Sequence, residues 1–180
     1  MRTGSWLLVA AVAAAVLFAL WTRQSVPDPI GRGSVAPGFS LPRLPAGGAE
    51  ISLASLRGHV VLLNFWATWC KPCEEEMPAM QRLHDALAPE GLALLAVSVD
   101  DDSEEVEEFL ARLGLTFAIL WDPAQRVSEN YQAYRFPETL LIGRDGVVVE
   151  RYIGPREWDS PLYQARIRRL LDGESSDTSR

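Results

Sequence analysis

The hydrophobic and polar positions of this chain alternate in blocks that predict strands and helices in turn. Residues 59–66 (HVVLLNFW) and 92–99 (LALLAVSV) are short apolar runs rich in branched side chains, which is typical of buried strands. Helices are expected over about 70–87 and 103–113. Ser103 is the expected cap of the second helix, and Gly114 is expected to end it. These four segments predict a core in which helices cover a sheet.

The remaining blocks complete the same pattern. Further elements are expected as strands at 39–41, 50–53 and 117–121, a helix from Asp122-Pro123 to about 132, a hairpin of 139–142 with 147–153, and a last helix at 160–171. Strands that alternate with helices predict an α/β fold with a central mixed sheet flanked by helices, and the first two strands predict an N-terminal hairpin extension.

The N-terminus carries a long apolar segment. Residues 6–21 are 16 apolar residues within an uncharged stretch from Thr3 to Thr22, just enough for a membrane span, with Trp6 and Trp21 at its two ends. No A-x-A cleavage pattern follows, so an uncleaved signal-anchor is favoured over a signal peptide. The positive charges before the span favour a cytoplasmic N-terminus with the bulk of the chain outside.

Composition along the chain predicts four parts. We expect a membrane anchor at 1–22, a Pro/Gly-rich linker at 23–34, one folded domain at 35–172 and a polar, disordered tail at 173–180. The formal net charge of -7 argues against nucleic-acid binding, which needs a basic surface. The acidic run between Asp100 and Glu108 is interpreted as the first turn of a helix, stabilised by the helix dipole.

The two cysteines of the chain, Cys70 and Cys73, form a C-x-x-C pair. Zinc needs about four ligands, and neither His59 nor His84 has metal-ligand spacing to this pair, so we expect no metal and no cofactor. A bridge between cysteines this close would close a very short loop and would constrain the chain little. The pair is therefore interpreted as a redox dithiol.

The position of the pair defines its chemistry. Cys70 follows a buried strand and opens a helix, where unpaired N–H groups and the helix dipole stabilise a thiolate, so it is the expected nucleophile. Cys73 is the expected resolving cysteine, and Lys71 adds positive charge nearby. Glu76 lies three residues after Cys73, on the same helix face, and is the expected proton acceptor if burial raises its pKa.

Three segments resemble the TlpA/ResA type of thioredoxin-like proteins. They are 64–73 (NFWATWCKPC) with 76–78 (EMP), 97–100 (VSVD) and 136–142 (FPETLLI). The resemblance covers roughly residues 35–172 and implies a thioredoxin-like fold. It also implies a thiol-disulfide oxidoreductase tethered to the bacterial inner membrane, with its C-terminal domain on the periplasmic side.

The resemblance further implies partners and site residues. Members of this type mostly reduce disulfides of secreted or periplasmic proteins, often the haem-attachment cysteines of apocytochrome c, with electrons from a transmembrane donor. Pro137 would be a cis-proline that, with Trp69 and Phe136, contacts the substrate, and Glu76 would match the family's active-site glutamate. Asn64 stands where thioredoxin has a buried aspartate, so the acid–base role would move to Glu76.

Three alternatives stay open at this point. A peroxiredoxin-like peroxidase would need a threonine shortly before its reactive cysteine, and Thr68 is present, but it would also need an activating arginine. A copper-binding metallochaperone or assembly factor would use the two thiolates together with a nearby methionine or histidine. An oxidase would use the same site in the opposite direction, because direction depends on the reduction potential.

Overall fold

The computed structural model describes residues 11–16, 18, 29–45 and 47–173. Within these residues, no helix is long and apolar enough to cross a lipid bilayer. Most of the anchor predicted over residues 1–22 lies outside the described residues. Only residues 11–16 and 18 of this range are described, and they are helical. Apart from residue 173, the predicted tail also lies outside them.

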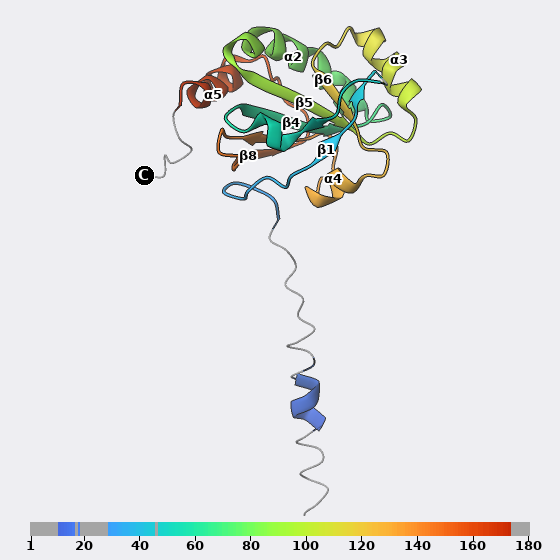
Figure 1. Cartoon of the computed structure of the whole chain (residues 1–180), viewed down its shortest axis with the longest axis vertical. Helices are drawn as coiled ribbons and strands as arrows, with labels where there is room; N and C mark the ends of the chain where they lie inside the picture. Colours follow the sequence, from blue (N-terminus) through green and yellow to red (C-terminus); the bar gives the residue numbers. More distant parts are fainter. Residues whose placement is uncertain (1–10, 17, 19–28, 46, 174–180) are drawn as a thin grey trace, which may run out of the picture.

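The folded domain has a six-stranded sheet at its centre, in the order β2-β6-β5-β4-β7-β8 (Figure 1). Strands β4, β5 and β6 are parallel, whereas β2, β7 and β8 run antiparallel to their neighbours, so the sheet is mixed as predicted. The strands are β1 (Ser40–Leu41), β2 (Arg43–Leu44), β3 (Ile51–Ser52), β4 (Val60–Trp66), β5 (Leu92–Ser98), β6 (Ala118–Trp121), β7 (Glu138–Ile142) and β8 (Val148–Ile153).

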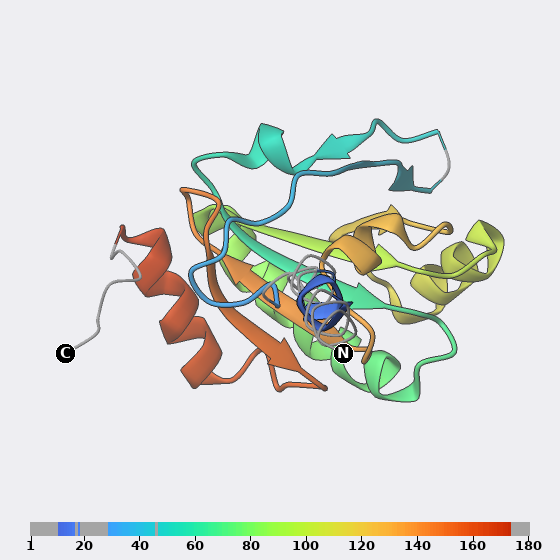
Figure 2. The ribbon, with the colours of Figure 1, turned by 90° about the horizontal axis from the view of Figure 1, so that it is seen from below.

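Helices cover both faces of this sheet. They are α2 (Lys71–Leu87), α3 (Ser103–Leu113), α4 (Arg126–Asn130) and α5 (Pro161–Leu171), with short 3₁₀ helices η1 (Leu53–Leu56) and η2 (Ala88–Glu90). Side chains of α2, α3 and α5 form one core cluster with one face of β4, and α4 forms a second cluster with the other face and the N-terminal extension. Figure 2 shows α4 in front of the sheet and α2 behind it.

Strand β4 lies between the two clusters. All seven of its residues are buried, because its alternate side chains enter the two core clusters, which explains the continuous apolar run of the sequence. Residues 60, 62 and 66 face α2, so Asn64 faces it too. Antiparallel pairing with β7 sets Asn64 opposite Thr139 and Phe65 opposite Glu138, so the loop after β4 lies beside the loop before β7.

The structure corrects three details of the sequence analysis. Helix α3 is capped by Asp102, whose side chain accepts the Glu104 N–H, and not by Ser103. Helix α4 has only five residues, because Gln125, with a φ of 55°, is not helical and the helix begins after it, where the Asp122 carboxylate accepts the N–H groups of Val127 and Ser128. A two-residue strand, β2, was not predicted and joins the main sheet beside β6. The hairpin extension is present as β1 paired antiparallel with β3.

The chain just before β1 also lies against the domain. Backbone hydrogen bonds join Gly33 N to Val148 O and Val148 N to Ser34 O, both at 2.8 Å. Ile30 packs against the second core cluster, and its carbonyl accepts a hydrogen bond from Arg151. Contacts with the domain therefore reach back to Ile30, inside the segment predicted as a linker.

Candidate active site

The cysteine pair sits where the central strand meets the first long helix. Cys70 is the N-cap of α2, with φ -86° and ψ 98°, and its Sγ accepts a hydrogen bond from the Cys73 N–H at 3.3 Å. Pro72 occupies the first turn, where a missing N–H leaves no hydrogen bond unmade. A backbone N–H and the helix dipole therefore both act on the sulfur of Cys70, which stabilises it as a thiolate.

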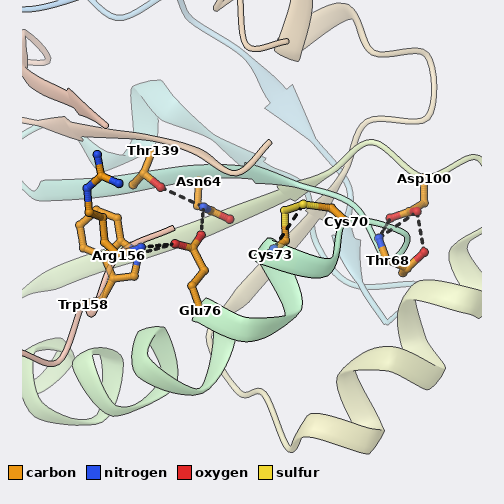
Figure 3. The surroundings of a disulfide bond; sticks show 9 residues. All are labelled: Asn64, Thr68, Cys70, Cys73, Glu76, Asp100, Thr139, Arg156 and Trp158. Atoms are coloured by element: carbon orange, nitrogen blue, oxygen red, sulfur yellow. Dashed lines mark hydrogen bonds between the residues drawn. A yellow bond between two sulfur atoms is a disulfide. The ribbon is translucent and has the colours of Figure 1, made fainter. Parts of the chain in front are cut away.

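The two cysteines form a disulfide, so the structure shows the oxidised state (Figure 3). The two residues differ in exposure: Cys70 is 6% exposed, whereas Cys73 is 0% exposed. The sulfur of Cys73 is therefore closed to a partner, which leaves Cys70 as the cysteine that a partner thiol or disulfide could reach. The order in which Cys70 attacks and Cys73 resolves stays a prediction.

Glu76 is a buried carboxylate one helical turn after Cys73. It is 3% exposed, and burial, opposed by its hydrogen bonds, raises its pKa to about 7. Three donors reach it: Asn64 Nδ2 binds Oε1 at 3.0 Å, while Trp158 Nε1 and Arg156 N bind Oε2 at 3.0 and 3.1 Å. A carboxylate with this pKa can exchange a proton near neutral pH, which is the property that a proton acceptor needs.

The side chains predicted to contact the substrate lie on the loops after β4 and before β7. Trp69 is 70% exposed, and its ring centroid lies 6.0 Å from that of Phe136, which is half-buried. The Phe136–Pro137 peptide bond is cis, and Pro137 is buried. The register of β4 and β7 brings these two loops together at the carboxyl end of β4, so Phe136 and Pro137 lie on the loop beside the one that carries Trp69 and Cys70.

Asp100 holds the loop that leads into the cysteines. Its carboxylate accepts hydrogen bonds from Thr68 N at 3.0 and 3.1 Å, from Thr68 Oγ1 at 2.8 Å and from Ser98 Oγ at 2.7 Å. Asp100 is 4% exposed and lies before α3, so its interpretation as part of that helix's acidic first turn was wrong. Because Thr68 lies two residues before Cys70, these contacts fix the approach to the nucleophile.

A buried ion pair holds the loop that leads into Pro137. Glu138 is 1% exposed and pairs with Arg151, and its Oε1 accepts the N–H groups of Tyr134 and Arg135 at 3.0 and 2.8 Å. Arg151 also donates to the carbonyls of residues 131 and 132 at 2.9 and 2.7 Å. The pair therefore fixes the backbone on the substrate side of the site.

Lys71 is the least constrained charge at the site. Its Nζ lies 3.0 Å from Glu74 Oε2 and its side chain is 72% exposed, so its effect on Cys70 is screened by water and by Glu74. Glu74 also pairs with Arg112 of α3 at 2.6 Å, and these hydrogen bonds lower its pKa. Glu74 thus joins the first turn of α2 to α3.

The structure places five of the six predicted site residues on the paired loops and first helical turn at the carboxyl end of β4, with Glu76 one turn further along α2, and it adds others. Arg156 and Trp158 follow β8, 80 and 82 positions after Glu76 in the sequence, and no local pattern could have placed them there. The sequence did signal Asn64, as a polar residue inside an apolar strand. Asp100 carried a weaker signal, a carboxylate directly after a buried strand.

A dithiol on the first turn of a helix, above a buried carboxylate in a thioredoxin-like fold, defines a thiol-disulfide oxidoreductase. The model of the AhpC/TSA family matches residues 32–151. The chain belongs to this family, and the relatives that it matches include proteins named thiol-disulfide oxidoreductase ResA.

The individual comparisons agree with this assignment. Thiol-disulfide oxidoreductase ResA of Geobacillus kaustophilus is 39% identical over 155 residues, covering 86% of each chain. Thioredoxin-like protein YneN of Bacillus subtilis is 40% identical over 128 residues, 69% of this chain and 73% of YneN. The crystal structure of a thioredoxin-family thiol:disulfide interchange protein from Chlorobium tepidum has a TM-score of 0.66 at 27% identity, covering 78% of this chain and 97% of that one.

Proposed function

We propose that this chain reduces disulfides of extracytoplasmic proteins, with Cys70 as nucleophile, Cys73 as resolving cysteine and Glu76 as proton acceptor. The observation that carries the proposal is the buried carboxylate of Glu76 one turn below the buried cysteine, with a pKa of about 7. A group that is half ionised near neutral pH can take the proton that a resolving thiol must lose.

The reduction proceeds in two displacements. The Cys70 thiolate attacks one sulfur of the substrate disulfide, forms a mixed disulfide and releases the other substrate sulfur as a thiolate. Glu76 takes the proton of the Cys73 thiol, and the resulting thiolate attacks Cys70 Sγ and releases the second substrate thiolate. Two electrons pass from the dithiol to the substrate, and the protein ends in the bridged state that the structure shows.

The substrate surface would be formed by Trp69, Phe136 and Pro137. A pair of rings beside an accessible sulfur offers apolar contact to an extended polypeptide, and the backbone before a buried proline can pair with it as a strand does. Because disulfides of folded proteins are rarely exposed, this surface suits unfolded or newly secreted chains. Apocytochrome c, whose two haem-attachment cysteines lie in an unfolded chain, is the substrate class we favour.

The proposed location follows from residues 6–21. This segment would anchor the protein in the bacterial inner membrane with the catalytic domain on the periplasmic side, where disulfides form. A transmembrane donor would return the bridged pair to the dithiol state. Labelling tests the topology: a membrane-impermeant maleimide added to intact spheroplasts should modify the single thiol of the Cys73→Ser variant, and full protection would place the domain in the cytoplasm.

Trapping in cells tests the function. The Cys73→Ser variant should accumulate mixed disulfides with substrate and donor, because Cys70 still attacks but nothing resolves the adduct. The Cys70→Ser variant is the matched control and should form none, because the remaining sulfur is buried. Adducts in both variants, or in neither, would contradict the proposed order of attack.

The structure favours neither the peroxidase nor the copper protein. The hydroxyl of Thr68, which a peroxidase would direct at its reactive cysteine, donates to Asp100 at 2.8 Å instead. Met77 and Met80, the methionines nearest to the pair in sequence, are each 0% exposed and belong to the core cluster behind α2. Activity assays with hydrogen peroxide and with an oxidised protein substrate distinguish the peroxidase from the proposed reductase.

A further inference from the structure

The side chain of Asn64 has a hydrogen-bonding imbalance in the oxidised protein. Its Nδ2 donates to Glu76 Oε1 at 3.0 Å and to Thr139 Oγ1 at 2.9 Å, which uses both amide hydrogens. Its Oδ1 is buried, and no donor among the described residues reaches it. A buried acceptor without a donor is unfavourable, so any state of the protein that supplies a donor to this oxygen is stabilised by it.

The orientation of the amide is fixed by its neighbours. Turning the amide over would place Oδ1 against the Glu76 carboxylate oxygen that now accepts from Nδ2 at 3.0 Å. Two acceptors at that distance repel each other, and a donor would be lost from a buried charge. The carbonyl of Asn64 therefore stays on the side away from Glu76.

That side faces the cysteines. Cys73 and Glu76 lie one helical turn apart on the buried face of α2, and Asn64 projects from β4 toward the same face. Figure 3 shows the amide nitrogen of Asn64 directed at Glu76 and its oxygen pointing toward Cys73. In the oxidised protein the sulfur of Cys73 is bonded to Cys70 and has no proton to donate.

We propose that Asn64 Oδ1 accepts a hydrogen bond from the Cys73 thiol in the reduced protein. Reduction by a dithiol breaks the Cys70–Cys73 bond and adds two electrons and two protons, while the donor dithiol becomes a disulfide. The Cys73 thiol formed in this way is buried and meets the unmatched oxygen. The thiol then gains an acceptor and the amide gains its missing donor.

This contact gives Asn64 two roles, which rest on the proposed function of Cys73 as resolving cysteine. It stabilises the dithiol state relative to the disulfide, because only the dithiol state satisfies the amide. It also holds the thiol protonated beside its proton acceptor, since the same amide binds Glu76 through its nitrogen. One amide thus links the buried thiol to the carboxylate that removes its proton.

Infrared spectroscopy of a single-thiol protein tests the contact directly. The chain has two cysteines, so the Cys70→Ala variant contains only the Cys73 thiol and gives one S–H stretching band. Adding Asn64→Leu should move this band to higher wavenumber, as for a thiol that loses its acceptor. The Thr139→Val variant is the control. Within the Asn64 amide, the Thr139 hydroxyl accepts from the nitrogen and not from the oxygen side, so the band should stay in place.

A band that does not move on Asn64→Leu would overturn the proposal. If the leucine variant does not fold, Asn64→Ala serves in its place with the same expectation. The spectrum needs no substrate, so it also separates this contact from the proposed function. An enzyme that fails to reduce proteins can still show the band shift, and an active enzyme can fail to show it.

The equilibrium with a dithiol buffer supplies a second measurement on the two-cysteine protein. Losing the contact should favour the disulfide form by up to about tenfold, the size of one hydrogen bond, which lowers the reduction potential by about 30 mV for this two-electron couple. Thr139→Val should shift the equilibrium less. An unchanged or higher potential in Asn64→Leu would contradict the stabilisation of the dithiol state.

Discussion

Replacing Glu76 with glutamine should remove a pH-dependent cost from the stability of the oxidised protein. The carboxyl group has an ordinary pKa of 4.5, and burial raises its pKa to about 7 in the folded chain. Its hydrogen bonds with Trp158, Arg156 and Asn64 oppose this shift without cancelling it. The folded state therefore holds a proton that the unfolded chain releases between these two values.

The sign and size follow from linkage between proton binding and folding. Below about pH 4.5 both states carry the proton, and the cost is absent. Between 4.5 and 7 the folded state binds more protons than the unfolded state, so the free energy of unfolding falls as pH rises. The full cost, reached above pH 7, is about 3 kcal/mol for a shift of this size. Glutamine cannot ionise, so the variant lacks this loss.

Urea unfolding of the oxidised proteins at a series of pH values measures the effect. The free energy of unfolding of Glu76→Gln, relative to the wild type, should increase by about 3 kcal/mol from pH 4 to pH 8. The matched control is Glu75→Gln, an exposed neighbour on the same helix, which should differ little from the wild type at any pH. A Glu76→Gln difference that stays constant with pH would refute the raised pKa and the proton-acceptor role built on it.

Two further predictions concern the loops that flank the site. Asp100→Asn should lower the free energy of unfolding, measured in urea, by about 1–3 kcal/mol, because one amide oxygen cannot accept from every donor that the carboxylate now binds. The same change should alter the alkylation rate of reduced Cys70, because Thr68 is held less firmly. A wild-type alkylation rate would show that the loop is held by other contacts. Glu138→Gln should lower the free energy of unfolding by about 3–5 kcal/mol, because the charge of Arg151 is left buried without a counter-charge. Glu90→Gln, in the exposed pair with Arg168, should lower it by less than about 1 kcal/mol. Equal costs in thermal or urea unfolding would contradict the burial argument.

The sequence was sufficient wherever one local pattern determined an element. The buried strand β4 and helix α2 lie within one or two residues of their predicted bounds. A continuous apolar run, and a C-x-x-C pair with proline, are each compatible with few other local structures. The fold class followed from the order of these blocks. The proximity of the two flanking loops needed the pairing of β4 with β7, which no local pattern gives and the register now shows.

Contacts between distant segments could not be predicted in the same way. Glu76 lies on α2 and its hydrogen-bond partners on β4 and the loop after β8, and a sequence pattern gives no distance between such segments. Asp100 was misread because an acidic run looks alike whether its first member caps a helix or binds a loop. Helix α4 was predicted too long because the positive φ of Gln125, at 55°, delays its first turn, and nothing in the sequence requires that conformation there.

The burial of Glu76 is better explained by chemistry than by stability. At neutral pH and above, its ionisation opposes folding by about 3 kcal/mol, whereas a glutamine of the same size would accept from Trp158 and Arg156 without that cost. The three donors reduce the penalty but leave the pKa near 7, the range in which a carboxylate can both take and return a proton. Asn64 fits the same interpretation, since its Nδ2 donates to Glu76 while its Oδ1 has no donor in the oxidised core. Both residues are placed near the one sulfur that must lose a proton for exchange to finish.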